Sequence, residues 1–270
     1  MKVVFITTNY LPFTGGVENH TASLAHSLSA RHEVKVAALR FRPQSLFSRL
    51  GVLGNNLLAP RRVEDRLDGK VSVISLGPNL LERLRLWPLA LRALPRIQRW
   101  FYEQLNRITR PAFLRAFTPR LRQVIAGADV VHCMAFGDLG IAAQAVANSC
   151  GIPFVCTPFV HPQQWGDGKD DVECYQRSEA VIGLTPADRD YLASLGVLPE
   201  RLHIIGVAPQ ISEKRDAVGF RRQHGLEGFP FVLYLGRMMY KKGSRALLAS
   251  ARRVWDEMPE VRFVFIGPND

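Results

Sequence analysis

The sequence lacks an apolar run long enough to cross a membrane, and it begins with a strand pattern rather than a signal peptide. Its four cysteines show no CxxC spacing, which argues against a disulfide framework or a cysteine zinc site and favours reduced cytosolic thiols. Acidic residues are scarce, 24 against 35 Lys and Arg, so the net charge is +11. We therefore expect a globular cytoplasmic protein that is attracted to something acidic: nucleic acid, an anionic membrane or a phosphorylated ligand.

The positive charge is concentrated between residues 80 and 125. This stretch has ten arginines against two glutamates, a net charge of +8. Apolar residues recur there at roughly helical spacing, with helix breaks predicted at Pro88, Pro95 and Pro111. One interpretation is an amphipathic surface that rests on anionic lipid at the inner face of the membrane; the other is a set of core helices with solvated basic faces. No helix-turn-helix, zinc or RNA-binding signature accompanies the charge, so a nucleic-acid partner is not expected.

The first forty residues predict one βαβ unit. Residues 2–8 (KVVFITT) read as a buried strand, residues 17–30 as an amphipathic helix and residues 33–39 as a second strand. The loop between strand and helix ends in Gly15-Gly16, at the carboxyl end of the strand and the N-terminus of the helix, where an anion is favoured. The alternative is a tight turn without a ligand, since the GxGxxG fingerprint is absent.

Strand and helix patterns alternate as far as about residue 207, which predicts a complete doubly wound α/β domain. Further strands are expected at residues 71–76, 128–133, 153–157, 180–184 and 201–205, and helices at 139–149, 170–177 and 185–195, the last capped by Thr185. Residues 41–69 read as an irregular excursion. Residues 208–228 are polar, as in a linker, and residues 229–270 contain one more βαβ unit, too little to cover both faces of a sheet. A second domain is therefore expected to start there without being completed.

His161 lies in the loop PFVHPQQWGDG that follows the strand at residues 153–157. That places it at the same sheet edge as Gly15-Gly16, either as a functional histidine or as an ordinary solvent-facing one. Asp170-Asp171 follows this loop, and we interpret the pair as the start of a helix rather than as a DxD-type carboxylate pair.

Four motifs, in this order, resemble the retaining family 4 glycosyltransferases, which have the GT-B fold. They are GGVENH, AVIGLTPADRDYL, YLGRMMYKKG and VRFVFIGPND. The resemblance implies an N-terminal acceptor domain over residues 1–207, a linker over 208–228 and the start of a donor domain over 229–270. It also implies transfer of a sugar from a nucleotide-sugar to a hydroxyl of a glycan or lipid-linked acceptor, with retained anomeric configuration and no metal or other cofactor.

The resemblance assigns roles to individual residues. Arg237 and Lys242 fall where the family binds the donor diphosphate, and a guanidinium fork and a point charge suit a dianion that gains charge as the bond breaks. For Lys242 the alternative is a solvated helix start. His161 falls where many members have an active-site histidine near the transferred sugar. Three residues of the N-terminal loop are implied in donor or acceptor binding: Gly15, Gly16 and Glu18.

The sequence departs from the family in one respect. The pair of glutamates that holds the donor's ribose and sugar would lie beyond residue 270. The chain is therefore expected to be a C-terminally truncated form, a fragment or half of a split enzyme, and to bind a sugar nucleotide poorly. The other hypothesis is a non-catalytic module that holds a glycan, lipid or partner. A sugar-nucleotide epimerase also shares the GT-B fold, but the GGVENH loop argues against it.

Overall fold

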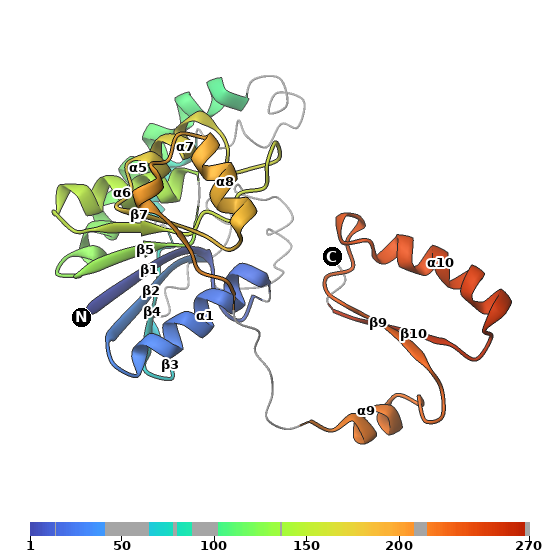
Figure 1. Cartoon of the computed structure of the whole chain (residues 1–270). Helices are drawn as coiled ribbons and strands as arrows, with labels where there is room; N and C mark the ends of the chain where they lie inside the picture. The colour runs from blue at the N-terminus through green and yellow to red at the C-terminus, as the bar shows by residue number, and fades with distance from the viewer. Residues whose placement is uncertain are drawn as a thin grey trace. The chain divides into compact units, whose positions relative to one another are not determined.

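The computed structural model describes residues 1–13, 15–40, 65–77, 80–87, 102–135, 137–207 and 215–267. The chain divides into two compact units, Met1–Pro209 (unit 1) and Gln210–Asp270 (unit 2), as Figure 1 shows.

Unit 1 is built on a twisted, mostly parallel sheet. Its described strands are β1 (Lys2–Asn9), β2 (Glu33–Arg40), β3 (Arg66–Asp68), β4 (Val71–Ser75), β5 (Val130–Cys133), β6 (Phe154–Cys156), β7 (Ala180–Gly183) and β8 (Leu202–Ile204). They lie in the order β3-β4-β2-β1-β5-β6-β7-β8, and among them only β3 runs antiparallel to its neighbour. The chain first builds outward from β1 on one side and then, from β5, on the other. The expected doubly wound α/β fold is confirmed, with its switch point between β1 and β5.

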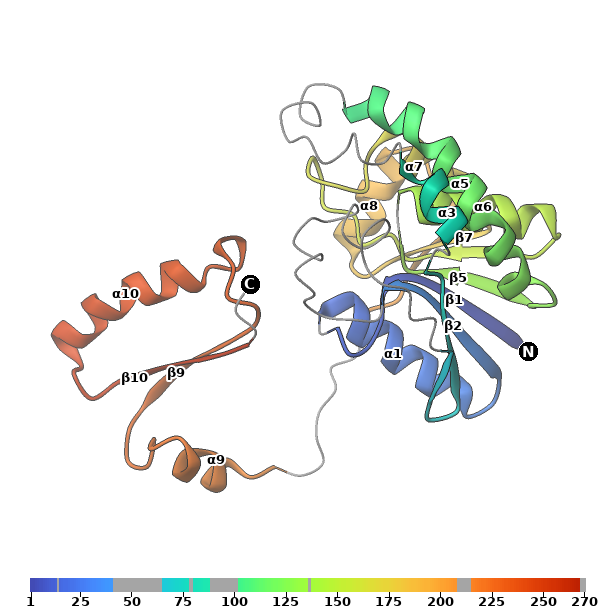
Figure 2. The same cartoon turned by 180° about the vertical axis from the view of Figure 1, so that it is seen from behind.

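Helices cover both faces of this sheet. The described helices of unit 1 are α1 (Gly16–Ser29), α3 (Leu80–Arg85), α5 (Tyr102–Ile125), α6 (Asp138–Ser149), α7 (Lys169–Gln176) and α8 (Pro186–Ser194), with a 3-10 turn η4 (Pro199–Arg201). Figures 1 and 2 show α1 on one face and the pair α5 and α6 on the other. Val3 and Phe5 of β1 are buried on the α1 side, whereas Val4 and Ile6 are buried on the α5–α6 side. A strand buried on both faces is the reason that KVVFITT reads as a continuous apolar run.

The predicted break at Pro111 is wrong. Helix α5 continues through both Pro111 and Pro119, although each proline removes one backbone hydrogen bond. Both prolines are exposed, whereas the opposite face buries Phe113 and Phe117, whose stacked rings have centroids 4.3 Å apart, in the core. Packing of that apolar face outweighs the local loss. The breaks predicted at residues 88 and 95 lie outside the described residues.

Strand β3 was not predicted. It lies in the stretch 41–69 that the sequence marked as irregular, of which residues 41–64 are outside the described part. Its sequence RLD has no apolar alternation, and it pairs at the sheet edge, Leu67 opposite Ser72. The cap predicted at Thr185 is confirmed: its side chain accepts from the Asp188 amide (3.1 Å), and the Asp188 carboxylate accepts from the Thr185 amide (2.9 Å).

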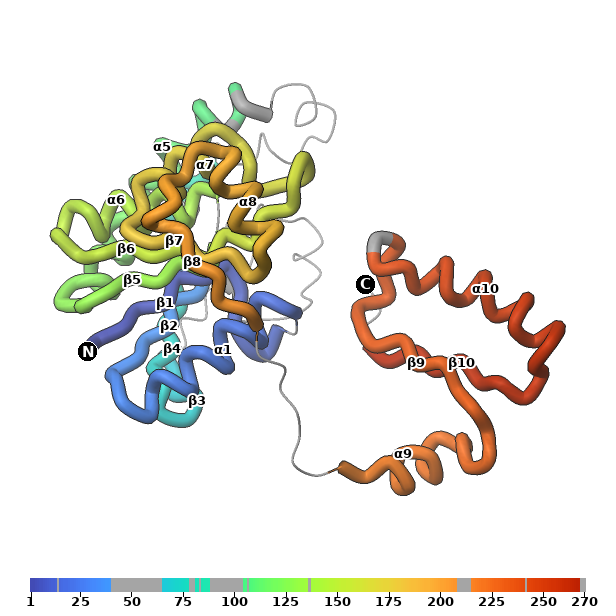
Figure 3. Tube along the Cα trace, viewed as in Figure 1, coloured from blue at the N-terminus to red at the C-terminus, as the bar shows by residue number. Residues whose placement is uncertain are grey.

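Unit 2 contains α9 (Ala217–Gln223), β9 (Phe231–Leu235), the 3-10 turn η5 (Tyr240–Lys242), α10 (Ser244–Glu257) and β10 (Arg262–Ile266). Figure 3 traces this path from α9 to β10. Helix α9 lies within residues 208–228, where the sequence suggested a linker. Strands β9 and β10 are parallel, and Trp255 of α10 packs edge-on against Phe263. Leu233 and Leu235, on the other face, are 48% and 75% exposed.

Candidate functional site

The glycine loop places an open space beside the N-terminus of α1. Gly15 caps the helix in an extended conformation, and a Cβ there would lie 2.3 Å from the Glu18 Oε2 atom. The same carboxylate accepts a hydrogen bond from the Asn9 side chain at the end of β1 (3.0 Å). At Gly16, by contrast, a Cβ would meet nothing within 4 Å. Gly15 thus makes room for Glu18, whereas the exposed Gly16 leaves the helix N-terminus open to solvent, where an anion is favoured.

Strand β3 anchors this loop from the side. The buried Tyr10 hydroxyl donates to the Asp68 carboxylate (3.0 Å), which also pairs with the His26 imidazole (3.1 Å). The Arg66 guanidinium donates to the Leu11 carbonyl. Burial, together with the Asp68 carboxylate, raises the pKa of Tyr10, so its hydroxyl remains a donor at neutral pH. Strand β3, which the sequence analysis did not predict, therefore fixes the path of the glycine loop, which it did predict.

The sequence analysis did not single out two histidines near this loop, His20 on α1 and His132 in β5. His132 is buried in β5, and its Nε2 atom lies 2.8 Å from the Thr157 hydroxyl. Burial lowers the pKa of His132 to about 4, with a smaller contribution from the nearby His20, so the ring is neutral at pH 7. His20, one turn beyond Gly16, meets the Phe159 ring edge-on, with centroids 6.0 Å apart. The only sequence signal was a histidine inside the apolar run VVHC.

His161 stands on a short hairpin in the loop after β6. Its backbone exchanges two hydrogen bonds with Trp165 (3.1 and 3.2 Å), and the two rings lie 4.1 Å apart between centroids. Phe159 and Gln163 adopt positive φ angles of 48° and 60°, which are uncommon for residues with a side chain. Both His161 and Trp165 are exposed. Because β1 and β6 run parallel through β5, this hairpin and the glycine loop lie at the same sheet edge, as expected; a catalytic role for His161 stays a prediction.

Asp170 and Asp171 are confirmed as helix-terminal. Both lie in the first turn of α7. The Asp171 carboxylate accepts a hydrogen bond from the Gly137 amide (2.6 Å). The φ angle of Gly137 is 68°, a conformation that favours glycine. The Arg110 guanidinium of α5 bridges Asp138 (2.9 Å) and Asp170 (2.8 Å). These carboxylates thus tie three helices together, and within the described residues no cluster of His, Cys, Asp or Glu has a metal-binding arrangement.

The two predicted cations lie on one loop of unit 2, at the carboxyl end of β9. The Arg237 carbonyl accepts from the Tyr234 hydroxyl and from the Met239 amide, both at 2.8 Å. Lys242 closes η5, and Gly243, with φ of 77°, leads directly into α10. Both cationic side chains are exposed. A guanidinium, an ammonium and a helix N-terminus on one loop form an arrangement that suits an anion.

Comparison with solved structures supports the fold. The chain is similar to Anabaena Alr3699/HepE in complex with UDP-glucose, with a TM-score of 0.62, 14% identity, and coverage of 99% of this chain and 61% of that one. It is also similar to trehalose-6-phosphate synthase OtsA (TM-score 0.63, 12% identity, coverage 100% and 66%). A third similar structure is UDP-GlcNAc 2-epimerase from Methanocaldococcus jannaschii (TM-score 0.55, 11% identity, coverage 99% and 66%).

The chain thus spans less than two thirds of the length of each of these structures. At these identities the likeness shows the fold alone, and it agrees with the expected GT-B class. No curated protein matches the chain. The family model described as Glycosyltransferase Family 4 matches residues 14–207, almost the whole of unit 1, and the chain therefore belongs to glycosyltransferase family 4.

Proposed function

We propose that the protein transfers a sugar from a nucleotide-sugar to an acceptor hydroxyl with retention of the anomeric configuration. The observation that carries this proposal is the family 4 match over the unit with the open glycine loop. Supporting it, the similar Anabaena structures are complexes with UDP and UDP-glucose. The proposed substrates are a nucleotide-sugar as the donor and a glycan or a lipid-linked molecule as the acceptor.

In this proposal Arg237 and Lys242 bind the donor diphosphate and stabilise the charge that develops on it as the glycosidic bond breaks. This needs no metal ion, because two cations and the N-terminus of α10 supply the positive charge. Gly16 gives a ligand access to the N-terminus of α1, with Glu18 held beside it by Asn9. We assign His161 to the transferred sugar because it falls where many family members have an active-site histidine, and because it lies at the same sheet edge as the glycine loop.

Because the chain spans 61–66% of the similar structures, we propose that it holds the acceptor domain and the start of the donor domain. The domain boundaries proposed from the sequence, near residues 207 and 229, are part of this hypothesis. Tight donor binding would then need residues outside this chain, and this chain alone would bind the nucleotide weakly.

Two measurements test the proposal. In the first, UDP, GDP and ADP are titrated into ¹⁵N-labelled protein, and the amides of residues 236–243 should shift with at least one nucleotide. In the second, a labelled nucleotide-sugar is incubated with an acceptor panel, and the anomeric configuration of any product is read by NMR. Nucleotide shifts without transfer leave the fragment hypothesis standing. No shift with any nucleotide and no transfer would favour the non-catalytic binding module.

A second proposal concerns the surface made by α3 and α5, which pack side by side (Figure 2). Four large apolar side chains on α3, in the turn directly after it and on α5 are 62–70% exposed: Leu81, Leu84, Trp87 and Ile108. Arg107 and Arg115 are exposed on α5 and pair with no acidic residue in the described part of the chain. We propose that this α3–α5 face rests on an anionic membrane surface. In the part of the chain that the structure describes, no helix is long and apolar enough to span a bilayer.

Co-sedimentation with anionic and neutral vesicles tests this second proposal. Binding to anionic vesicles should exceed binding to neutral ones and weaken with salt. Substituting both Leu84 and Trp87 with Asp should abolish it, whereas Leu198→Asp, at an exposed leucine elsewhere in unit 1, should not. Equal recovery on both vesicle types would refute the proposal.

A further inference from the structure

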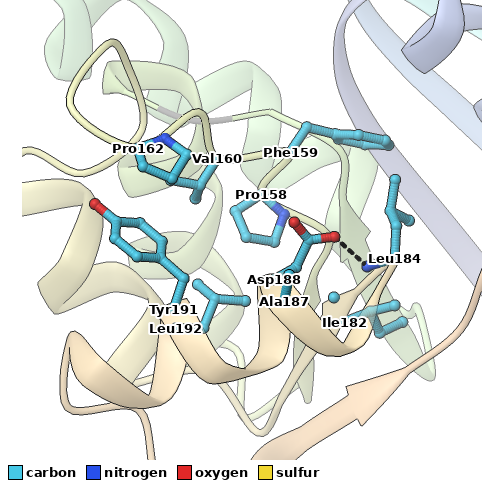
Figure 4. Close-up of a pocket in the computed structure, with 11 residues that line it drawn as sticks. Pro158, Phe159, Val160, Pro162, Ile182, Leu184, Ala187, Asp188, Tyr191 and Leu192 are labelled. Atoms are coloured by element: carbon cyan, nitrogen blue, oxygen red, sulfur yellow. Dashed lines mark hydrogen bonds between the residues drawn. The ribbon is translucent and has the colours of Figure 1, made fainter.

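An apolar cavity of about 110 Å³ lies under the loop after β6 (Figure 4). It is enclosed by three segments at the carboxyl edge of the sheet: the loop after β6, the end of β7 and the first two turns of α8. The side chains that line it are mostly apolar, and those labelled in Figure 4 include Pro158, Val160, Pro162, Ile182, Leu184 and Tyr191.

The polar side chains in this lining are already bonded to their neighbours. The Asp188 carboxylate accepts from the backbone amides of Leu184 (3.0 Å) and Thr185 (2.9 Å), the first of which is the dashed line in Figure 4. The Tyr191 hydroxyl donates to the Asp167 carboxylate (3.0 Å). An occupant therefore gains from burying apolar surface rather than from hydrogen bonds to these two groups.

The roof of the cavity is held in place before any ligand arrives. Asp167 accepts from the Tyr191 hydroxyl and from the Gln163 amide (2.5 Å), and the buried Tyr175 hydroxyl donates to the Gly166 carbonyl (2.8 Å). Phe159, in the wall, keeps its positive φ of 48°. Strained backbone that the surroundings hold in place is concentrated at functional sites, and a preformed site saves the free energy of ordering a loop on binding.

Phe159 links the cavity to the glycine loop. It lines the cavity, and its ring meets His20 of α1, one turn after Gly16. A molecule that extends from the cavity past Phe159 would therefore meet α1 close to its N-terminus. In the proposed function, that is the direction from which an acceptor hydroxyl would approach.

We propose that this cavity is an acceptor subsite for a hydrocarbon group, an inference that rests on the proposed transferase function. Apolar cavities of about 150 Å³ bind benzene in proteins. A cavity of about 110 Å³ accommodates a slightly smaller group, such as a branched or short linear alkyl end. The acceptor class is thus an amphipathic alcohol or glycoside, with a hydrocarbon part beside the hydroxyl-bearing part, rather than a free sugar.

The test uses hexyl β-D-glucoside below its micelle concentration and, in parallel, glucose. In ¹⁵N-labelled protein the hexyl glucoside should shift the amides of Val160, Leu184 and Ala187, and glucose should leave them unchanged. Ala187, at the exposed rim, lines the cavity, so Ala187→Leu should fill it and weaken hexyl glucoside binding by about 10-fold. Ala193→Leu, at an exposed position of the same helix outside the lining, is the matched control and should bind as the wild type does.

No shift at these amides, equal shifts with glucose, or equal binding by Ala187→Leu would each overturn the subsite. Ala187→Val serves if the larger side chain prevents folding, and the comparison of the two wild-type titrations needs no variant. The readout needs no nucleotide, so it fails or succeeds separately from the nucleotide titration of residues 236–243. If hexyl glucoside shifts the cavity amides but no nucleotide shifts residues 236–243, the cavity remains a binding site but is not an acceptor subsite.

Discussion

Around the glycine loop of unit 1, several polar side chains are held by neighbouring side chains, whereas in unit 2 the side chains of the two candidate cations, Arg237 and Lys242, are exposed. Asn9 holds Glu18, and Thr157 holds His132. The backbone of the loop that carries Arg237 is fixed by the Tyr234 hydroxyl and by the Met239 amide. We expect this contrast to appear in the effects of substitutions. Substitutions at buried positions of unit 1 should then lower stability, whereas those at exposed positions of the glycine loop and of the unit 2 loop should lower ligand binding.

The largest expected effect is on stability. Phe154 is fully buried in β6, below the loop that carries His161, so Phe154→Ala should lower the free energy of unfolding by about 3–5 kcal/mol. Leu235 of β9 is 75% exposed, and Leu235→Ala should change it by less than about 0.5 kcal/mol. Urea unfolding followed by circular dichroism measures both. Similar losses of unfolding free energy in both variants would contradict the contrast between the buried position in unit 1 and the exposed position in unit 2.

The second prediction concerns the pH dependence of stability. The pKa of His132 is about 4 in the folded protein, lower than the usual 6.5, so the unfolded chain binds more protons between these values. The stability contributed by the neutral ring is complete above pH 6.5 and is lost as the pH falls towards 4, a loss of about 3 kcal/mol. The difference in unfolding free energy between wild type and His132→Leu, measured in urea at several pH values, should shrink by that amount. A difference that stays constant from pH 7 to pH 4 would show that His132 titrates normally.

The third prediction concerns charge in unit 2. Arg237→Ala should weaken nucleotide binding, or slow sugar transfer, by about 100-fold, because it removes the proposed donor to the diphosphate. The free energy of unfolding should stay within about 0.5 kcal/mol of the wild type, since the side chain is exposed. Arg253→Ala, at an exposed arginine of α10, is the matched control for loss of net charge. If both variants bind nucleotide equally well, the diphosphate assignment is wrong.

The smallest effect separates the two glycines. Gly16→Ala should leave stability within about 0.5 kcal/mol and weaken ligand binding by about 10-fold, because its Cβ enters empty space that a ligand would occupy. Gly15→Ala should also displace Glu18, whose Oε2 atom lies 2.3 Å from the new Cβ, and so lower stability as well. Calorimetry for binding and urea unfolding for stability distinguish the two. Unchanged binding by Gly16→Ala would mean that the space stays empty in the complex.

Features encoded by local patterns were predictable from the sequence. The apolar run at residues 2–8 and the glycine pair sufficed to place β1 and the start of α1, and the TPAD sequence sufficed for the cap at Thr185. Features that depend on distant partners were not predictable. Strand β3 has no apolar alternation, and its Asp68 meets Tyr10, a residue 58 positions away. Pro111 suggested a break, but core packing of the opposite helix face decided the outcome.

The candidate site shows the same limit. The position of His161 after β6 could be predicted from strand order, but the hairpin around it could not. The loop is fixed by the hydrogen bond from Tyr191 of α8 to Asp167, 24 residues apart in the sequence. The sequence does not specify that α8 packs against this loop. His132 was missed because a histidine in an apolar strand gives no sign of the Thr157 hydroxyl, which lies directly after the next strand.

The bridge made by Arg110 has a practical consequence for engineering this protein. Its guanidinium joins the first turns of α6 and α7, which begin directly after the loops that leave β5 and β6. Replacing surface arginines to lower the high isoelectric point would, at this one position, leave two helix-terminal carboxylates repelling each other below those loops. A library of charge variants should therefore keep Arg110 constant.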